Sequence, residues 1–305
     1  MDKIKIIIIG GPTASGKSEL AVQAALALDG EVISCDSMQI YKGMDIGTAK
    51  IRADEMRGVP HHMLDVADPK QPFSAFDYSH AVTKIINELH CKGKMPIIAG
   101  GTGLYVESLV YPLSFIVQSD ENVRKRLYRE YESLGAQTMY ERLCEIDPQD
   151  AAKIHPNNVK RLLRALEIYE LSGKTKSQCA EREINPAYEP GMFITDPQRE
   201  LLYAAIDARV EKMFEQGIVD EVETPLSNGV SWDSQSMQAI GYKEFKPYFA
   251  GEATLEEVKE DIKRNSKKYA KRQTTWFKRY SFAKHYKNDE YGKMLADMVE
   301  FGKNE

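Results

Sequence analysis

The sequence predicts an α/β protein with a doubly wound parallel sheet and an all-helical insertion. Three observations predict this class. A nearly continuous apolar run at residues 4–9 ends at a pair of glycines, as is typical of parallel strands buried on both faces. Strand-like and helix-like segments then alternate as far as residue 103, with short glycine-rich joints. Between about residues 120 and 177 the strand signals stop, and charged helical patterns replace them.

The alternating elements can be placed one by one. A helix is expected from residue 17, because apolar residues recur at helical spacing from Leu20 to Leu28. A second strand is expected at residues 32–35. A capping-box pattern at residues 74–77 predicts the start of a second helix, and residues 95–99 predict the next strand.

Helical patterns fill the middle of the chain, at residues 122–135 and 158–173. We expect strand character to return at residues 201–206, followed by a helix that Asp207 caps and that carries Arg209. The expected core comprises residues 1–115 and 196–305, and the expected helical insertion comprises residues 116–195.

The composition excludes several classes of protein. Of the 305 residues 42% are hydrophobic and 29% are charged, which excludes collagen-like, low-complexity and wholly disordered chains. The four cysteines lack CxxC or zinc-ligand spacing and predict isolated thiols in a reducing compartment. The N-terminal apolar run is too short and too charged for a signal peptide, and no later run reaches about 18 residues. We therefore expect a cytoplasmic protein.

The C-terminal stretch at residues 259–287 is a compositional outlier. It holds 11 Lys and Arg against 2 Asp and Glu, a net charge of +9 in a chain whose formal net charge is -5. Aromatic residues are interleaved with the cations. A solvated helix face with its aromatic side chains in the core would explain the pattern. A surface for a nucleic-acid backbone would also explain it, because clustered cations concentrate positive potential where a polyanion binds.

The strongest motif is GPTASGKS at residues 11–18, a complete phosphate-binding loop between an apolar strand and a helix. Its glycines let backbone N–H groups converge on a phosphate, and the helix N-terminus adds partial positive charge. Lys17 can reach the outer phosphate, and the Ser18 hydroxyl can hold Mg²⁺. The predicted diphosphate- or nucleotide-binding residues are Gly11, Pro12, Thr13, Ala14, Ser15, Gly16, Lys17 and Ser18. The motif does not distinguish ATP from another kinase donor or a prenyl diphosphate.

Two further candidates follow predicted strand ends. Asp36 ends the second strand, at the edge where open parallel sheets bind ligands. It could hold Mg²⁺, act as a general base or cap a helix, and its position alone does not choose among these roles. Thr102 belongs to a glycine-rich turn at residues 100–103 and would project into the same crevice, unless the turn is only a tight connection.

Together these residues resemble the bacterial tRNA dimethylallyltransferases, also called tRNA isopentenyltransferases. The resemblance extends over nearly the whole chain, and its second and fifth segments are long and family-specific. The segments are GPTASGKS at 11–18, DSMQIYKGMDIGTAK at 36–50, PHHMLD at 60–65, IIAGGTGLY at 97–105, HPNNVKRLLRALEIYELSGKT at 155–175 and AKRQTTWFKRY at 270–280.

The resemblance implies a P-loop NTPase-like fold and a specific reaction. A dimethylallyl group would move from dimethylallyl diphosphate to N6 of the adenosine at tRNA position 37, in tRNAs that read codons starting with U. Asp36 would be the general base, and Thr102 would lie near the transfer centre. Lys17, Arg209 and Mg²⁺ at Ser18 would neutralise the departing diphosphate.

The resemblance also implies that the partner is tRNA, bound through its anticodon stem-loop, with no membrane and no obligate protein partner. The helical insertion would clamp the stem-loop, and the basic C-terminal region would add backbone contacts. The implied tRNA-binding residues are Asp36, Ser37, Met38, Gln39, Thr102, Arg124, Lys160, Arg161, Leu162, Leu163, Arg164, Lys271 and Arg272. We expect a monomer.

Three other functions share part of the pattern. A small-molecule P-loop kinase would use the same loop for ATP, and a cytokinin-type adenylate prenyltransferase would use it for the same donor. Neither has a use for the inserted helices and the basic C-terminal stretch. A non-catalytic RNA-binding module with a vestigial nucleotide site is the third, and the intact Lys17, Ser18, Asp36 and Thr102 argue against it.

Overall fold

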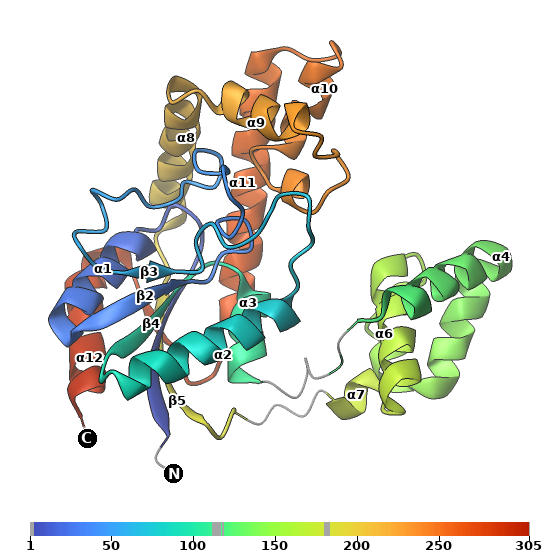
Figure 1. Ribbon diagram of the computed structural model, residues 1–305, viewed down its shortest axis with the longest axis horizontal. Helices are drawn as coiled ribbons and strands as arrows, with labels where there is room; N and C mark the ends of the chain where they lie inside the picture. Colours follow the sequence, from blue (N-terminus) through green and yellow to red (C-terminus); the bar gives the residue numbers. More distant parts are fainter. Residues whose placement is uncertain (1–2, 112–116, 118, 180–183, 305) are drawn as a thin grey trace. The chain divides into compact units, whose positions relative to one another are not determined.

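The computed structural model describes residues 3–111, 117, 119–179 and 184–304, and Figure 1 shows its ribbon. The chain divides into two compact units. The core unit comprises Met1–Val106 and Ala187–Glu305, and the insertion unit comprises Glu107–Pro186. These edges differ from the predicted ones. Position 116 lies outside the described residues, and residues 188–195, which we assigned to the insertion, form a strand of the core sheet.

A six-stranded parallel sheet forms the centre of the core unit, in the order β3-β2-β4-β1-β5-β6. The strands are β1 (Ile4–Gly10), β2 (Gly30–Ser34), β3 (His61–His62), β4 (Met95–Gly100), β5 (Tyr188–Thr195) and β6 (Lys284–Tyr286). Side chains from Ile6 to Ile9 are fully buried, because successive residues of a central strand face opposite layers of the fold. The predicted parallel α/β class is confirmed.

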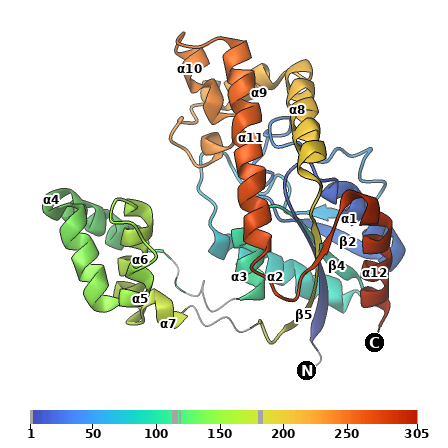
Figure 2. The ribbon, with the colours of Figure 1, turned by 180° about the vertical axis from the view of Figure 1, so that it is seen from behind.

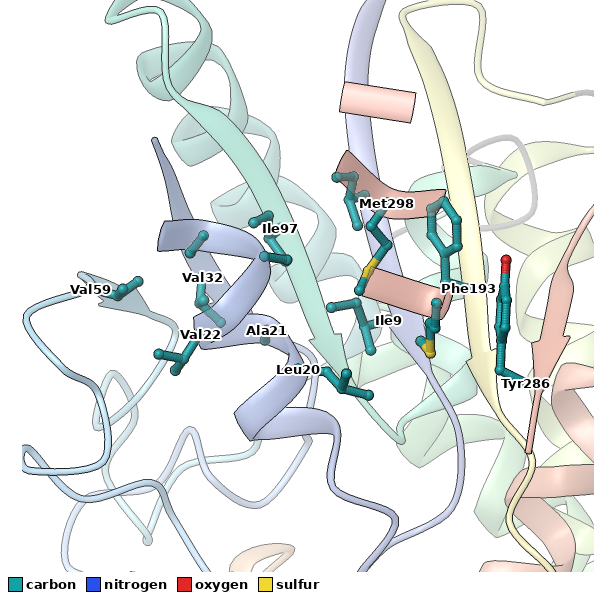
Figure 3. Close-up of a cluster of buried hydrophobic side chains, with 14 residues drawn as sticks. Ile9, Leu20, Ala21, Val22, Val32, Val59, Ile97, Phe193, Tyr286 and Met298 are labelled. Carbon is teal, nitrogen blue, oxygen red and sulfur yellow. The ribbon is translucent and has the colours of Figure 1, made fainter. Parts of the chain in front are cut away.

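One face of the sheet is covered by α1 (Lys17–Leu28) and α12 (Tyr291–Lys303). Figures 1 and 2 show these two helices side by side, although more than 260 residues separate them in the chain. Figure 3 shows their side chains gathered against the strands, with Leu20 of α1 and Met298 of α12 beside Ile9 of β1. This cluster fixes the start of α1, and therefore the phosphate-binding loop, on the sheet.

The other face carries α2 (Ala75–Cys91) and the start of α3 (Gly103–Val110). The predicted capping box is present, because Ser74 and Asp77 each accept the backbone N–H of the other. Tyr78 is buried, stacks on Tyr105 at a ring-centroid distance of 4.0 Å and donates a hydrogen bond to the carbonyl of Ser34 at the end of β2.

The C-terminal part of the core unit is mostly helical. Its elements are α8 (Arg199–Glu215), α9 (Ile218–Ser227), η2 (Ser236–Gln238), η3 (Lys243–Phe245), α10 (Lys246–Phe249), α11 (Leu255–Phe277) and η4 (Asn288–Glu290). Figures 1 and 2 show α8 and α11 packed along each other. Their contact brings the basic stretch next to the carboxyl end of the sheet, where the phosphate-binding loop lies.

The prediction of a strand at residues 201–206 is wrong. These residues lie in α8, whose buried side chains Leu202, Ile206 and Val210 recur every fourth residue, whereas Leu201 is 53% exposed. Asp207 therefore lies inside the helix and caps nothing, and Arg209 lies near the middle of α8. The returning strand is β5, whose pattern is interrupted by Pro190 and Gly191.

Among the described residues of the insertion unit, all regular secondary structure is helical, as predicted. It contains α4 (Glu121–Ile146), α5 (Pro148–Ala151), α6 (Val159–Ser172) and α7 (Lys176–Cys179). Gly135 interrupts α4 with a φ of 82°, a left-handed value that favours glycine. The chain thereby folds back, and Leu127, Met139 and Leu143 of α4 share one buried cluster with side chains of α6.

Two composition-based expectations concern the whole chain. Within the described ranges every helix is too short or too polar to cross a bilayer. Cys35, Cys91 and Cys144 are free thiols.

Candidate active site

The phosphate-binding loop connects β1 to α1, as its sequence context predicts. Gly11 and Gly16 have φ values of 141° and 82°, in the region that favours glycine. A Cβ on Gly11 would lie 2.1 Å from Oγ1 of Thr195, so a glycine is also needed for space. Ser15 and Thr195 share a hydrogen bond of 2.7 Å in the interior, which ties the loop to the end of β5.

Gln273 of α11 holds the opposite side of the loop. Its Oε1 accepts the backbone N–H of Thr13 at 2.8 Å, and its Nε2 donates to the carbonyl of Gly101 at 3.0 Å. The side chain is 4% exposed and joins the phosphate-binding loop to the turn at residues 100–103. We did not single it out from the sequence. The available signal was a polar residue on the apolar helix face that Ala270 and Phe277 define.

Lys17 begins α1 and lies folded over the loop. Its Nζ donates to the carbonyl of Pro12 and to Oγ of Ser15. Burial, followed by repulsion from the Arg209 guanidinium, lowers the pKa of Lys17 from its ordinary value of 10.5 to about 7, although attraction to Asp36 opposes the shift. A diphosphate placed here would favour the protonated amine, because it brings compensating negative charge.

Arg209 extends from α8 to the same place. Its Nη1 donates to Oγ1 of Thr13 at 2.8 Å, and its Nη2 donates to the carbonyl of Thr48 at 3.0 Å. Burial lowers the pKa of Arg209, and Asp36 partly opposes this. An arginine stays protonated in proteins, so the site holds a fixed cation beside the phosphate-binding loop. Arg209 carried no signal of its own in the sequence; its expected role rests on the family resemblance, and the structure places it beside the phosphate-binding loop.

Asp36 follows β2 and caps the turn after it. Its Oδ1 accepts the backbone N–H groups of Met38 at 2.9 Å and Gln39 at 3.4 Å. Its Oδ2 accepts no hydrogen bond from the described residues. Asp36 therefore caps a turn and not a helix, since no helix follows it, and this leaves one carboxylate oxygen available for a second role.

Thr102 points toward the same turn. Its Oγ1 accepts the backbone N–H of Ser37 at 3.0 Å and lies 3.4 Å from the Ser37 hydroxyl. Its own N–H donates to the carbonyl of Cys35 at 3.1 Å. The wall of the crevice at this point is formed by Gly100 and Gly101, and Thr102 is not among the lining residues, contrary to the expectation that it projects into the crevice.

One cavity of about 1030 Å³ in the core unit is lined by the phosphate-binding loop, Asp36 and Arg209. It lies at the carboxyl ends of β1, β2 and β4, where parallel sheets bind ligands. The sequence-predicted residues that line it are Thr13, Ala14, Ser15, Gly16, Lys17, Ser18, Asp36, Ser37, Met38, Gln39, Arg209 and Arg272. A cavity with cations at the phosphate loop and a carboxylate at its side can bind a diphosphate and accept a proton near it.

The residues present fit a phosphate-bound magnesium ion. Ser18 is exposed in the first turn of α1 and lines the cavity. Among the described residues no cluster of three His, Cys, Asp or Glu side chains could hold a metal alone. A cation here would be held by one hydroxyl and by the ligand's own phosphate oxygens, the arrangement typical of phosphate-binding loops.

The basic stretch divides into two parts along α11. Lys259 and Lys263 both pair with Glu211 of α8, at 3.0 and 2.7 Å. Lys271 and Arg272 are exposed and have no ion-pair partner among the described residues, and Arg272 stacks over Tyr269 at 5.4 Å from the ring centroid. The first part therefore serves packing between helices, and the second part presents free positive charge beside the cavity.

The predicted RNA contacts of the insertion unit lie in different environments. Lys160 and Arg161 are exposed at the start of α6. Arg124 and Arg164 pair with the buried carboxylate of Glu167, at 3.2 and 2.8 Å. The side chains of two further predicted residues lie in the hydrophobic cluster of the unit, where they pack the helices together; these are Leu162 and Leu163.

Known proteins match this chain over most of its length. A tRNA dimethylallyltransferase of Caldanaerobacter subterraneus subsp. tengcongensis is 47% identical over 293 residues, which cover 94% of this chain and 93% of the relative. One from Halalkalibacterium halodurans is 47% identical over 279 residues, covering 90% and 88%.

Solved structures match as well. A full-length tRNA isopentenylpyrophosphate transferase from Bacillus halodurans has a TM-score of 0.73 at 42% identity, over 98% of both chains. A eukaryotic dimethylallyltransferase, solved in the course of its action on tRNA, has a TM-score of 0.81 at 30% identity, over 94% of this chain and 74% of the other. The family described as IPP transferase matches residues 39–280, and this chain belongs to that family.

Proposed function

We propose that this protein transfers a dimethylallyl group from dimethylallyl diphosphate to N6 of the adenosine at tRNA position 37. The products are N6-(dimethylallyl)adenosine and diphosphate. The observation that carries the proposal is that the phosphate-binding loop, Arg209 and the carboxylate of Asp36 line one cavity in a member of this family. The names of the relatives support the reaction class.

The donor binds with its diphosphate on the loop. Its C1–O bond breaks with the electron pair leaving on the diphosphate, so charge grows on those oxygens in the transition state. Lys17, the loop N–H groups and Arg209 face that charge. Ser18 would hold Mg²⁺, which when bound would neutralise further phosphate charge.

The acceptor amine approaches from the side of Asp36. The lone pair of N6 is delocalised into the purine ring, so N6 is a weak nucleophile until its proton is removed. As N6 forms a bond to C1, that proton passes to Oδ2 of Asp36, the oxygen that does not cap the turn. A positioned general base of this kind contributes about 10²–10⁴-fold.

The acceptor must be a base that has left its stack, because a stacked base cannot reach into a cavity. Met38 and Gln39 line the cavity next to Asp36 and would surround this base. Lys271 and Arg272 of the core unit, and Lys160 and Arg161 of the insertion unit, would contact the backbone of the anticodon stem-loop. The enzyme would work as a monomer in the cytoplasm, where its tRNA substrates are.

The test is an acceptor competition. The purified protein is incubated with labelled dimethylallyl diphosphate and Mg²⁺, together with bulk tRNA, AMP or no acceptor. We expect label in tRNA alone, in a nucleoside whose mass corresponds to dimethylallyladenosine. A tRNA with guanosine at position 37 is the matched control and should gain no label.

Two outcomes would contradict the proposal. Label in AMP would assign the protein to the adenylate prenyltransferases. A parallel reaction with ATP in which a phosphorylated product forms, while no tRNA gains label, would assign it to the small-molecule kinases.

A further inference from the structure

The carboxylate of Glu221 on α9 binds three consecutive backbone N–H groups of another segment. Its Oε2 accepts from Asp45 at 2.8 Å and Ile46 at 2.7 Å, and its Oε1 accepts from Gly47 at 2.8 Å. Successive N–H groups that converge on one anion form a backbone nest, and each bond is strengthened by the charge. More than 170 residues separate the two segments in sequence, so this contact fixes a loop to a distant helix.

Tyr242 completes the arrangement from a third segment. Its side chain is fully buried, and its hydroxyl donates to Oε1 of Glu221 at 2.5 Å. Burial and the neighbouring carboxylate raise the pKa of Tyr242 well above its ordinary value, so the phenol remains a donor. A Cβ on Gly47 would lie 2.5 Å from the Tyr242 ring, and this close approach requires glycine. The turn at residues 45–47 is therefore held on two sides.

The residue after this turn touches the candidate active site. The carbonyl of Thr48 accepts Nη2 of Arg209 at 3.0 Å and Nε2 of Gln39 at 3.3 Å. Arg209 uses its other Nη atom for Thr13 of the phosphate-binding loop, so its guanidinium is held between two points. A shift of the Thr48 carbonyl would remove one of them.

We infer that Glu221 is a positioning residue: by anchoring the turn at residues 45–47 it holds the Thr48 carbonyl where it orients Arg209 toward the diphosphate. The carboxylate itself does not line the cavity. The inference rests on the proposed function only in taking diphosphate as the ligand of the loop. Without this contact of Glu221, Arg209 would keep its charge, but its guanidinium would no longer be held in one orientation.

The alternative is that Glu221 only fastens α9 to the turn at residues 45–47 and contributes to stability. The two roles differ in how Glu221 and Arg209 combine. A positioning residue acts through Arg209, so its removal has little further effect once Arg209 is absent. A fastening residue acts independently, and the two effects on ligand binding then add.

The test uses the full chain and inorganic diphosphate with Mg²⁺, measured by titration calorimetry. Glu221→Gln keeps the size of the side chain, but its amide nitrogen cannot accept from backbone N–H groups. We expect this variant to bind diphosphate about 10-fold more weakly, as for a disturbed hydrogen bond to a charged group. Glu223→Gln, on the same helix with an exposed side chain, is the matched control and should bind like the wild type.

The decisive comparison repeats Glu221→Gln in an Arg209→Ala background. We expect no further loss of diphosphate affinity there. Equal losses in both backgrounds would overturn the inference, and so would wild-type affinity of Glu221→Gln. If Glu221→Gln fails to fold, Tyr242→Phe removes only the phenol donor and should weaken binding about 3-fold, a loss that must likewise vanish with Arg209→Ala.

The two proposals fail in different ways. If the wild-type chain binds diphosphate but does not transfer dimethylallyl to tRNA, the proposed reaction is wrong and the Glu221 comparison still decides the positioning role. If transfer proceeds and the Glu221→Gln variant retains wild-type kcat and KM for the donor, only the positioning role is wrong.

Discussion

Arg209 and Asp36 act on the charge of Lys17, because all three side chains line one cavity. Lys17 is the side chain whose pKa lies near physiological pH, since burial and Arg209 lower it to about 7. Below this pH the amine is charged, and above it the amine is neutral. A bound diphosphate favours the charged form, so binding above pH 7 is linked to the uptake of a proton.

Diphosphate affinity should therefore fall as pH rises through about 7, by at most tenfold per pH unit. Lys17→Arg is the comparison, because arginine remains charged throughout and the ligand's own titration cancels in the ratio of the two affinities. Both proteins are measured by titration calorimetry between about pH 6 and 9. We expect the diphosphate affinity of the wild type, divided by that of Lys17→Arg at the same pH, to decline as pH rises. A ratio that is constant over this range would contradict the lowered pKa.

Asp36→Asn separates the two roles of this side chain. Asparagine retains Oδ1 as an acceptor for Met38 and Gln39, so the turn should keep its shape. It cannot take the proton from N6, and we expect kcat to fall by about 10²–10⁴-fold. Affinity for tRNA should stay within about threefold of the wild type in a filter-binding assay. Retained turnover would mean that another group, or water, accepts the proton.

At the scale of elements, strong local signals predicted the structure well. The capping box at Ser74 and the phosphate-binding loop specify their own backbone geometry through nearby residues. The strand β5 was missed because Pro190 and Gly191 break its apolar run, and its identity comes from pairing with β1. Residues 201–206 are apolar enough for a strand, but they lie in α8, where Leu202 and Ile206 share a buried cluster with Ala270 of α11.

Dependence on partners far away in sequence also limited the prediction of the candidate site. Residues of the phosphate-binding loop could be identified from a contiguous motif. Gln273 and Glu221 could not, because each acts on backbone atoms far away in sequence, and no residue pattern marks those partners in advance. Arg209 was implied by the family resemblance alone.

Gln273→Ala tests the link between α11 and the phosphate-binding loop. It leaves the N–H of Thr13 and the carbonyl of Gly101 without their partner, and two such losses in the interior cost about 2–4 kcal/mol of stability. Thermal and urea unfolding should show the loss. Thr275→Ala, exposed on the same helix, is the control and should change stability by less than about 0.5 kcal/mol. Equal stability of the two variants would contradict the link.

At the scale of the whole molecule, the charge distribution matters more than the net charge. A chain with a formal net charge of -5 would repel a polyanion if its charges were mixed evenly. Lys271 and Arg272 of α11 lack acidic partners among the described residues, whereas Lys259 and Lys263, earlier in the same helix, pair with Glu211. The contribution of each of these cations to tRNA binding should therefore depend on its position along α11.

Replacing Lys271 and Arg272 together by alanine tests this dependence. If each contacts one phosphate, the slope of log affinity against log salt concentration should become shallower by about 1.5–2, and all tRNAs should weaken alike. The control replaces Lys259 and Lys263, whose charges are already paired with Glu211, Glu256 and Glu260, and should leave the slope nearly unchanged. Binding measured at several salt concentrations separates the two cases. Equal changes in both double variants would mean that the tRNA responds to overall charge, and an altered preference among tRNAs would mean that the pair reads bases.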